Sequence, residues 1–318
     1  MKVQFLKDLK ADELLSFLQS PLYFKTQDHY ACTQSYLAYN QKYFGSAYSD
    51  CSMIVTESNS PLICFYAFCK GEVLSLFDGP VRVFDLPSEK TAIAYQHLFA
   101  KIDAIFLNGI NFIHNNYFTM AYFNRTVRSR INSSAFIDLS QTPEAIRMSF
   151  RNSYKPLINW GKKNITVEIF DSKNNDRDKF MQFKSFHIEV AGRQTRSDET
   201  WELQYDAISK GDAYLVLGYF QAKLVTAVYV IFGKAWAYYG VGVNDRELMA
   251  ENLPIAHYSM MVAINKAKDM GLKFFDMGSI SVVEGEEKLN AIAKFKKGFS
   301  NTCISEISYV ANTKTEVL

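Results

Sequence analysis

The sequence predicts an α/β (α+β) protein of two similar domains, each a mixed, mainly antiparallel sheet flanked by helices. At 318 residues the chain is longer than one average domain. One order of elements occurs twice: helices, a meander of three strands, a helix and one more strand. No residue-level repeat accompanies it, so the duplication is architectural. We place the border near residue 140, which gives domains at 1–140 and 141–318.

The first half contains two short helical patterns, a meander of strands, a longer helix and a closing strand. Turn-forming residues at 59–61 and 70–72 separate the strands of the meander. The helices are predicted from helical periodicity, and the strands from runs of β-branched and aromatic residues. The helices are expected at 9–19, 30–43 and 88–106, and the strands at 52–57, 62–69, 73–77 and 109–115.

The second half follows the same order with clearer boundaries. A helix is expected to begin near Pro143, and Pro156 should kink or split it because proline lacks the amide N–H of a helix interior. Two more helices are expected before the meander, at 180–190 and 200–209. The strands are expected at 134–139, 165–170, 213–220, 224–232, 235–243 and 303–310.

Residues 253–299 form a helix–strand–loop unit around which we expect a site. Pro254 suits a first helical turn, with Asn252 as the expected cap, and Gly271 ends the helix. A strand at 272–276 and a polar loop follow, and a basic-aromatic segment at 292–299 closes the unit. The loop end of such an α/β unit can hold a ligand.

Composition narrows the function. Lysine and arginine number 35 against 33 acidic residues, a net charge of +2, so we do not expect binding to DNA, and any anion site must be local. Five cysteines without a C-x-x-C pair indicate neither a disulfide framework nor a zinc site, and the histidines lack metal-ligand spacing. Neither a signal peptide nor a transmembrane segment is expected, which predicts a cytoplasmic protein. The motifs G-x-S-x-G and the P-loop are absent.

Two residues of the 253–299 unit are candidates for chemistry. Asp276 comes at the carboxyl end of a strand, where it could orient an amine or cap the next turn. His257 comes at a helix start, which lowers the pKa of an imidazole and favours a neutral base. Because Met261 and Ile264 follow one turn later, a half-buried structural histidine is the alternative.

The basic candidates fall in two segments. Arg193 and Arg196 follow a glycine in a polar loop, where a guanidinium can grip a phosphate or carboxylate or serve solubility alone. Lys294 and Lys296 lie two apart, so on a helix they cannot both point one way. By themselves, Lys296 and Lys297 fit a solvated surface better than a site.

Four segments of the second half together resemble the Fem-type aminoacyltransferases and the GNAT acyltransferase superfamily. The first is the arginine- and glycine-containing segment after a helix, and the second is the aromatic-glycine strand. The other two resemble the family's F-D-hydrophobic-G strand end and its F-K-x-G-F segment. In this sequence they are residues 191–196, 238–240, 274–279 and 295–299. The resemblance covers residues 130–318, whereas over 1–130 it rests on element order.

The resemblance implies tandem GNAT-like domains and an N-acyltransferase. Such an enzyme moves an acyl or aminoacyl group to an amine of a cell-envelope precursor, for example a nucleotide amino sugar or a peptidoglycan peptide. The donor would be acyl-CoA, an acyl carrier protein or aminoacyl-tRNA. Lys296 matches the family's lysine, which implies contact with the acyl oxyanion or a phosphate. With Asp276 and His257 it forms the expected catalytic set, and the expected substrate-binding residues are Arg193, Arg196, Tyr239 and Lys294.

Two departures from the family leave the donor open. No segment fits the long coiled-coil arm of some tRNA-dependent members. Residues 243–248 lack the glycines of the R/Q-x-x-G-x-G/A loop that holds acetyl-CoA in GNAT enzymes. The alternative from another class is a non-catalytic binding module of GNAT-like fold for an anionic sugar or nucleotide ligand.

Overall fold

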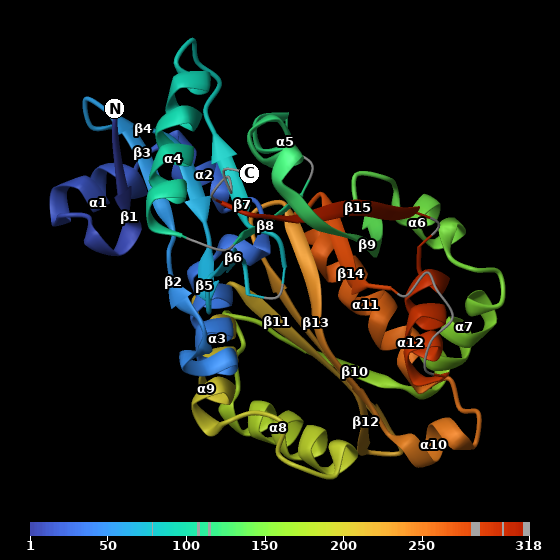
Figure 1. The fold of residues 1–318 in the computed structure, drawn as a ribbon. Helices are drawn as coiled ribbons and strands as arrows, with labels where there is room; N and C mark the ends of the chain where they lie inside the picture. The colour runs from blue at the N-terminus through green and yellow to red at the C-terminus, as the bar shows by residue number, and fades with distance from the viewer. Residues whose placement is uncertain (78, 107–108, 114–115, 281–286, 301, 314–318) are drawn as a thin grey trace. The chain divides into compact units, whose positions relative to one another are not determined.

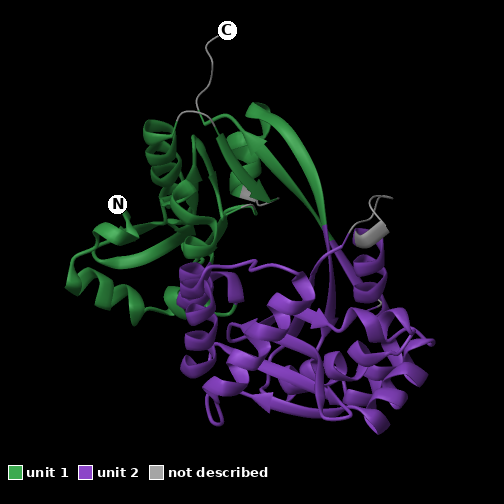
Figure 2. Cartoon of the chain, turned by 90° about the horizontal axis from the view of Figure 1, so that it is seen from below, with its two compact units in different colours: residues 1–28, 40–132, 305–318 green, residues 29–39, 133–304 purple. Residues whose placement is uncertain are grey.

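The computed structural model describes the chain except residues 78, 107–108, 114–115, 281–286, 301 and 314–318 (Figure 1). The chain divides into two compact units, which Figure 2 shows in different colours. Unit 1 comprises residues 1–28, 40–132 and 305–318, and unit 2 comprises residues 29–39 and 133–304. The segment 29–39 therefore belongs to the same unit as the motifs of the second half. A functional division near residue 140 stays a prediction.

Unit 1 contains an antiparallel four-stranded sheet and a second set of paired strands. The four-stranded sheet has the order β1-β3-β4-β7. In the second set, of order β2-β5-β6-β8-β15, only β6 and β8 run parallel among the described pairs. The strands are β1 Lys2–Phe5, β2 Ser49–Asp50, β3 Met53–Glu57, β4 Ser60–Tyr66, β5 Phe68–Lys70, β6 Val73–Ser75, β7 Arg82–Asp85, β8 Gly109–Ile113 and β15 Thr302–Ala311.

The helices of unit 1 agree with the expected positions at two places and add others. The helical patterns at 9–19 and 88–106 correspond to α1 and α4. The observed helices are α1 Ala11–Leu18, α2 Pro21–Thr26, α4 Thr91–Ile105 and α5 Asn116–Tyr122. The helix α3, Gln34–Phe44, begins in unit 2 and ends in unit 1, as its residue range requires.

The sheet of unit 2 has the order β10-β11-β12-β13-β14-β9. All of these neighbours are antiparallel except β13 and β14, which run parallel. The predicted mixed, mainly antiparallel sheet is therefore confirmed. The strands are β9 Thr126–Asp138, β10 Thr166–Phe170, β11 Ala213–Phe220, β12 Lys223–Phe232, β13 Trp236–Asn244 and β14 Phe274–Ser279.

The helices of unit 2 correct two expected details. Asn252 does not cap α11: it has a left-handed φ of 63°, and Pro254 takes the N-cap position without a side-chain hydrogen bond. The split expected at Pro156 comes earlier, since Pro156 lies in the first turn of α7, where no amide donor is needed. The expected polar loop falls partly on residues 281–286, outside the described residues. The helices are α6 Pro143–Ser149, α7 Tyr154–Asn164, α8 Arg177–Ala191, α9 Asp198–Lys210, α10 Arg246–Ala250, α11 Ile255–Asp269 and α12 Glu287–Gly298.

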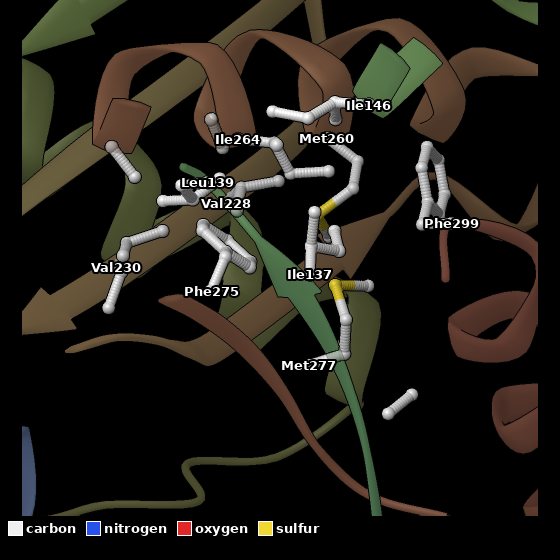
Figure 3. Packing of buried hydrophobic residues seen from close by; sticks show 14 of the residues in the cluster. Ile137, Leu139, Ile146, Val228, Val230, Met260, Ile264, Phe275, Met277 and Phe299 are labelled. Carbon is white, nitrogen blue, oxygen red and sulfur yellow. The ribbon is translucent and has the colours of Figure 1, made fainter. Parts of the chain in front are cut away.

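The hydrophobic core of unit 2 lies between its sheet and α11. Met260 and Ile264 of α11 point toward Phe275 and Met277 of β14 and toward Val228 of β12 (Figure 3). Side chains alternate along a strand, so residues 274, 276 and 278 of β14 face away from this core. The packing thereby presents Asp276 on the sheet face opposite α11.

Candidate functional site

The candidate site lies where β13 and β14 stop pairing. The parallel pairing covers three residue pairs and ends at Tyr238 and Asp276. Beyond this point β13 continues beside β12 as far as Asn244, whereas β14 pairs with β9 at Ser279. A register shift opposite Tyr229 and Val230 leaves Gly240 as an extra residue in β13. Such a bulge bends a strand, which helps the two neighbours to separate.

Asp276 is held at this point by two hydrogen bonds. The hydroxyl of Tyr30 donates to Oδ2 at 2.9 Å, and the backbone N–H of Gly278 donates to Oδ1 at 2.6 Å. Gly278 has a left-handed φ of 78°, which a glycine adopts without strain. The carboxylate is therefore fixed in orientation by two donors from different segments.

Lys296 of α12 reaches the same point. Its Nζ donates to the carbonyl oxygen of Ser279 at 3.0 Å. A methyl group placed on Gly278 would lie 3.1 Å from this Nζ and 3.2 Å from the ring of Tyr238. The ammonium, Tyr238 and the end of β14 thus surround one small region.

The electrostatics of Lys296 set it apart from its neighbours on α12. Burial lowers the pKa of Lys296, and the nearby charge of Asp276 acts in the opposite direction without cancelling the effect. Lys294 and Lys297 are exposed. The two-residue spacing therefore separates Lys294 from Lys296 as expected, and only Lys296 faces the strand ends.

His257 lies in an aromatic cluster next to α12. Its ring contacts Tyr154 at 4.5 Å, Phe295 at 5.5 Å and Phe299 at 6.0 Å between centroids. Burial lowers the pKa of His257 to about 4, while the backbone of Pro254 acts weakly in the other direction. The imidazole is therefore neutral at pH 7, as a base must be, but its contacts are those of a packing residue. Its catalytic role stays a prediction.

Tyr239 and Lys294 lie outside this constellation. Tyr239 packs against the core between the sheet and α11, and burial raises its pKa to about 12. The side chain of Lys294 is exposed, and its backbone carbonyl accepts a hydrogen bond of 3.4 Å from the Tyr154 hydroxyl. Contact of either residue with a substrate stays a prediction.

The two loop arginines have different surroundings. Arg193 follows the left-handed C-cap Gly192 and is exposed. Arg196 donates from Nε to the Tyr39 hydroxyl at 2.8 Å, and its Nη1 lies 3.1 Å from Nε2 of His187. Its guanidinium also lies over the ring of Trp201, 4.8 Å from the centroid.

Several buried polar atoms occur around Arg196. Burial and, to a smaller extent, the charge of Arg196 together lower the pKa of His187 to about 4. Trp201 Nε1 and Gln204 Oε1 are buried and have no hydrogen-bond partner among the described residues. Buried polar groups are normally hydrogen-bonded, so these unpartnered atoms distinguish the interior near α8 and α9 from an ordinary core.

No group of three or more His, Cys, Asp or Glu side chains among the described residues could hold a metal ion. No helix in that part of the chain has the length and apolar character required to cross a membrane.

The arrangement of the strands is that of several solved structures. FemX matches with a TM-score of 0.67 at 12% identity over 98% of both chains. The chain has the tandem GNAT fold. A tandem GNAT protein from the clavulanic acid biosynthesis pathway matches with a TM-score of 0.52 at 9% identity, over 99% of this chain and 100% of that one.

A third structure of this fold is L-PGS from Bacillus licheniformis. It matches with a TM-score of 0.56 at 10% identity, over 97% of this chain and 93% of that one. Neither a family model nor a curated protein matches the sequence. The structural likeness confirms the predicted fold over nearly all of the chain, including residues 1–130, where the prediction rested on element order alone.

The structure brings together two of the predicted site residues and adds two others. Lys296 and Asp276 lie at the same strand ends, joined there by Tyr30 and Tyr238. Tyr30 stacks on Tyr238 with centroids 4.5 Å apart and rings 12° from parallel. Sequence reasoning missed Tyr30, because no motif marks the segment 29–39 as part of unit 2.

Proposed function

We propose that this protein is an N-acyltransferase that moves an acyl or aminoacyl group to an amine of a cell-envelope precursor. The acceptor would be a nucleotide amino sugar or a peptidoglycan peptide, and the reaction would take place in the cytoplasm. The fold shared with FemX and the Fem-type motifs of residues 274–279 and 295–299 support the proposal.

The single observation that carries the proposal is the position of Lys296. Lys296 is half-buried, has a lowered pKa and lies where the parallel strands β13 and β14 separate. Its Nζ is 3.0 Å from the carbonyl oxygen of Ser279 and close to Asp276. Ionisable groups with a perturbed pKa gather at functional sites more than elsewhere. A lysine that served solubility alone would be expected at an exposed position such as those of Lys294 and Lys297.

The chemistry follows from these two charges. The amine nitrogen attacks the acyl carbonyl, a C–N bond forms, and the carbonyl oxygen gains negative charge that the Lys296 ammonium would stabilise. Asp276 would orient the amine and accept its hydrogen bond. The bond from the acyl carbon to the donor oxygen or sulfur then breaks, and a proton from the amine is passed to the leaving group.

The turn after β13 favours an acyl donor that needs no diphosphate-binding site at this turn. Oδ1 of Asp245 accepts hydrogen bonds from the backbone N–H groups of Glu247 and Leu248, at 3.0 and 3.1 Å. Oδ2 of Asp245 accepts from Lys223 at 2.9 Å. Because its own carboxylate takes these donors, a diphosphate would have to displace it. An aminoacyl-tRNA or acyl carrier protein needs no such loop.

The acceptor side of the proposal rests on the arginines. Arg196 uses Nε and Nη1 for protein contacts, which leaves Nη2 for an acceptor phosphate or carboxylate. Arg193 is exposed and would add a second guanidinium from the same loop. Tyr239 and Lys294 are kept as secondary candidates for substrate contact.

One observation favours the alternative of a non-catalytic binding module. The Tyr30 hydroxyl donates to Asp276 at the position where an acceptor amine would be oriented. A module of this kind would bind an anionic sugar or nucleotide at Arg196 without transferring an acyl group.

The test offers the protein each donor class with label in the acyl group. Purified protein is incubated with labelled acyl-CoA, acyl carrier protein or aminoacyl-tRNA and a panel of amine acceptors, and mass spectrometry follows the amine. We expect label on an acceptor amine for at least one pair. Calorimetric binding of an acceptor without transfer from any donor would instead establish the binding module.

A further inference from the structure

Polar contacts of Tyr30, Ser35 and Tyr39 with described residues attach the segment His29–Tyr39 to the rest of unit 2. Tyr30 donates to Asp276 at 2.9 Å, Ser35 donates to Asp212 at 2.6 Å, and Tyr39 accepts from Arg196 at 2.8 Å. These contacts reach β14, the start of β11 and the loop before α9. They fix the segment against the sheet face that carries Asp276.

Tyr30 is the member of this segment at the site. Its side chain is 8% exposed, stacks on Tyr238 and touches the ring of His29 at 4.5 Å. The ring of His29 in turn lies 5.6 Å from Trp236. Aromatic contacts on both sides leave the Tyr30 ring little freedom, so its hydroxyl is aimed at one carboxylate oxygen.

A buried hydroxyl that donates to a carboxylate favours the ionised form of the acid. The Gly278 N–H acts on the other oxygen in the same way. The two oxygens of a carboxylate together offer about four lone-pair sites, which is more than the Tyr30 and Gly278 donors use. Tyr30 is thus compatible with an amine bound to the same carboxylate.

We propose that Tyr30 is a positioning residue for acyl transfer, which holds the Asp276 carboxylate ionised and aimed at the acceptor amine. This inference rests on the proposed function. It assigns a role in the reaction to a residue that lies 246 positions before Asp276 in the sequence. Tyr30 acts through Asp276 and does not itself contact the acyl carbon.

Other ionisable groups face Asp276 from the elements around it. They are Lys296 on α12 and Tyr238 on β13, and behind Tyr30 the ring of Tyr36 meets it edge-on at 5.4 Å. Burial raises the pKa of Tyr238, and charge from Tyr36 and Asp276 raises it further. A tyrosine with a raised pKa does not titrate at acid pH, so Tyr238 does not contribute to a titration followed there.

The experiment uses Tyr30→Phe, which keeps the ring stack and removes only the donor. Loss of one hydrogen bond to the ionised acid should move the titration midpoint of Asp276 up by about one to two pH units. The measurement is the carbon-13 resonance of the Asp276 carboxylate in the full chain, followed over pH. The acid limb of kcat/KM should move in the same direction by the same amount.

Tyr214→Phe is the matched control. Tyr214 is buried and donates to the Ala263 carbonyl at 2.6 Å on the other face of the sheet. Its loss should lower the melting temperature and leave the Asp276 midpoint unchanged. A general destabilisation is thereby separated from an effect on the carboxylate.

The outcomes separate the two proposals. An unchanged Asp276 midpoint in Tyr30→Phe overturns the positioning role, whether or not the protein transfers acyl groups. A raised midpoint together with an unmoved acid limb also overturns it, because Asp276 then does not limit the reaction. A raised midpoint in a protein with no transfer activity would keep the contact to the carboxylate but remove both the proposed function and the role in it.

Discussion

Replacing Lys296 with methionine tests the site most directly. Lys296→Met keeps the aliphatic length that fills the space beside Gly278 and Tyr238 and removes the charge. In the proposed reaction this ammonium meets negative charge that grows on the acyl oxygen. Loss of one such donor typically lowers turnover about 100- to 1000-fold, or roughly 2.7–4 kcal/mol of transition-state stabilisation.

The effect on folding should differ in sign. Burial lowers the pKa of Lys296 in the folded protein, so the charged side chain opposes folding at every pH below that lowered value. This penalty disappears only as the pH rises through the folded pKa toward that of the unfolded chain. Lys296→Met removes the penalty, so the melting temperature at pH 7 should be unchanged or slightly higher.

The assay compares Lys296→Met with Lys297→Met at saturating donor. Lys297 is the next residue on α12 and is exposed, so its loss should be nearly silent. Because the ammonium acts in the transition state, kcat and kcat/KM should fall by similar factors in Lys296→Met. Retention of more than half of the wild-type turnover would show that this lysine has no part in the chemistry.

Three further predictions concern the surroundings of the site. Gly278→Ala introduces a methyl group 3.1 Å from the Lys296 Nζ at a φ of 78°, so we expect about 1–2 kcal/mol loss of stability by urea unfolding and reduced turnover; normal values for both would refute the close fit. Arg193→Ala should weaken acceptor binding about tenfold in calorimetry without changing the melting temperature, whereas Arg196→Ala should reduce both; equal acceptor affinities in wild type and both variants would remove the arginines from the site. Since the pKa of His257 falls from 6.5 to about 4 on folding, the unfolded chain binds more protons in that window and stability should decrease as the pH falls from 6.5 to 4; His257→Phe should show a flatter decrease, and a pH dependence identical to that of wild type would contradict the burial argument.

The regular elements of unit 2 could be predicted because local signals agree with the fold. The expected strands at 213–220, 224–232 and 235–243 differ from β11, β12 and β13 by one residue at most at each end. Their turn at Gln221 and Ala222 has two residues of positive φ, which suits a two-residue hairpin. The helical period and Gly271 likewise located α11 and its end.

The site could be predicted only where a motif identified it. The F-K-x-G-F segment singled out Lys296 from Lys294 and Lys297, which differ little in local sequence. Tyr30 could not be found, because its contact with Asp276 spans 246 residues and depends on the segment 29–39 belonging to unit 2. Long-range contacts of this kind leave no periodic signal in the chain.

The two loop arginines illustrate a different limit. The sequence treats Arg193 and Arg196 alike, since both follow Gly192 in a polar loop. The structure separates them by burial: Arg196 enters an aromatic and imidazole environment, while Arg193 stays exposed. Removal of Arg196 should therefore cost stability, because His187 and Tyr39 would lose a partner, whereas removal of Arg193 should not.

The buried polar and charged groups of unit 2 reduce its folding stability, which favours a functional site over a domain that has lost its activity. Lys296 is partly buried, which lowers its pKa and makes its charged form unfavourable. His187 and Trp201 each have a buried polar atom with no hydrogen-bond partner among the described residues. Each of these features reduces stability, and an apolar side chain of similar volume would remove the penalty. In a module that only retained its shape, nothing would oppose such replacements, whereas acyl transfer needs the charge of Lys296 at the strand ends. Of these groups, Lys296 lies close to Asp276, and His187 and Trp201 contact Arg196, the two residues to which the proposed reaction assigns the amine and the acceptor anion.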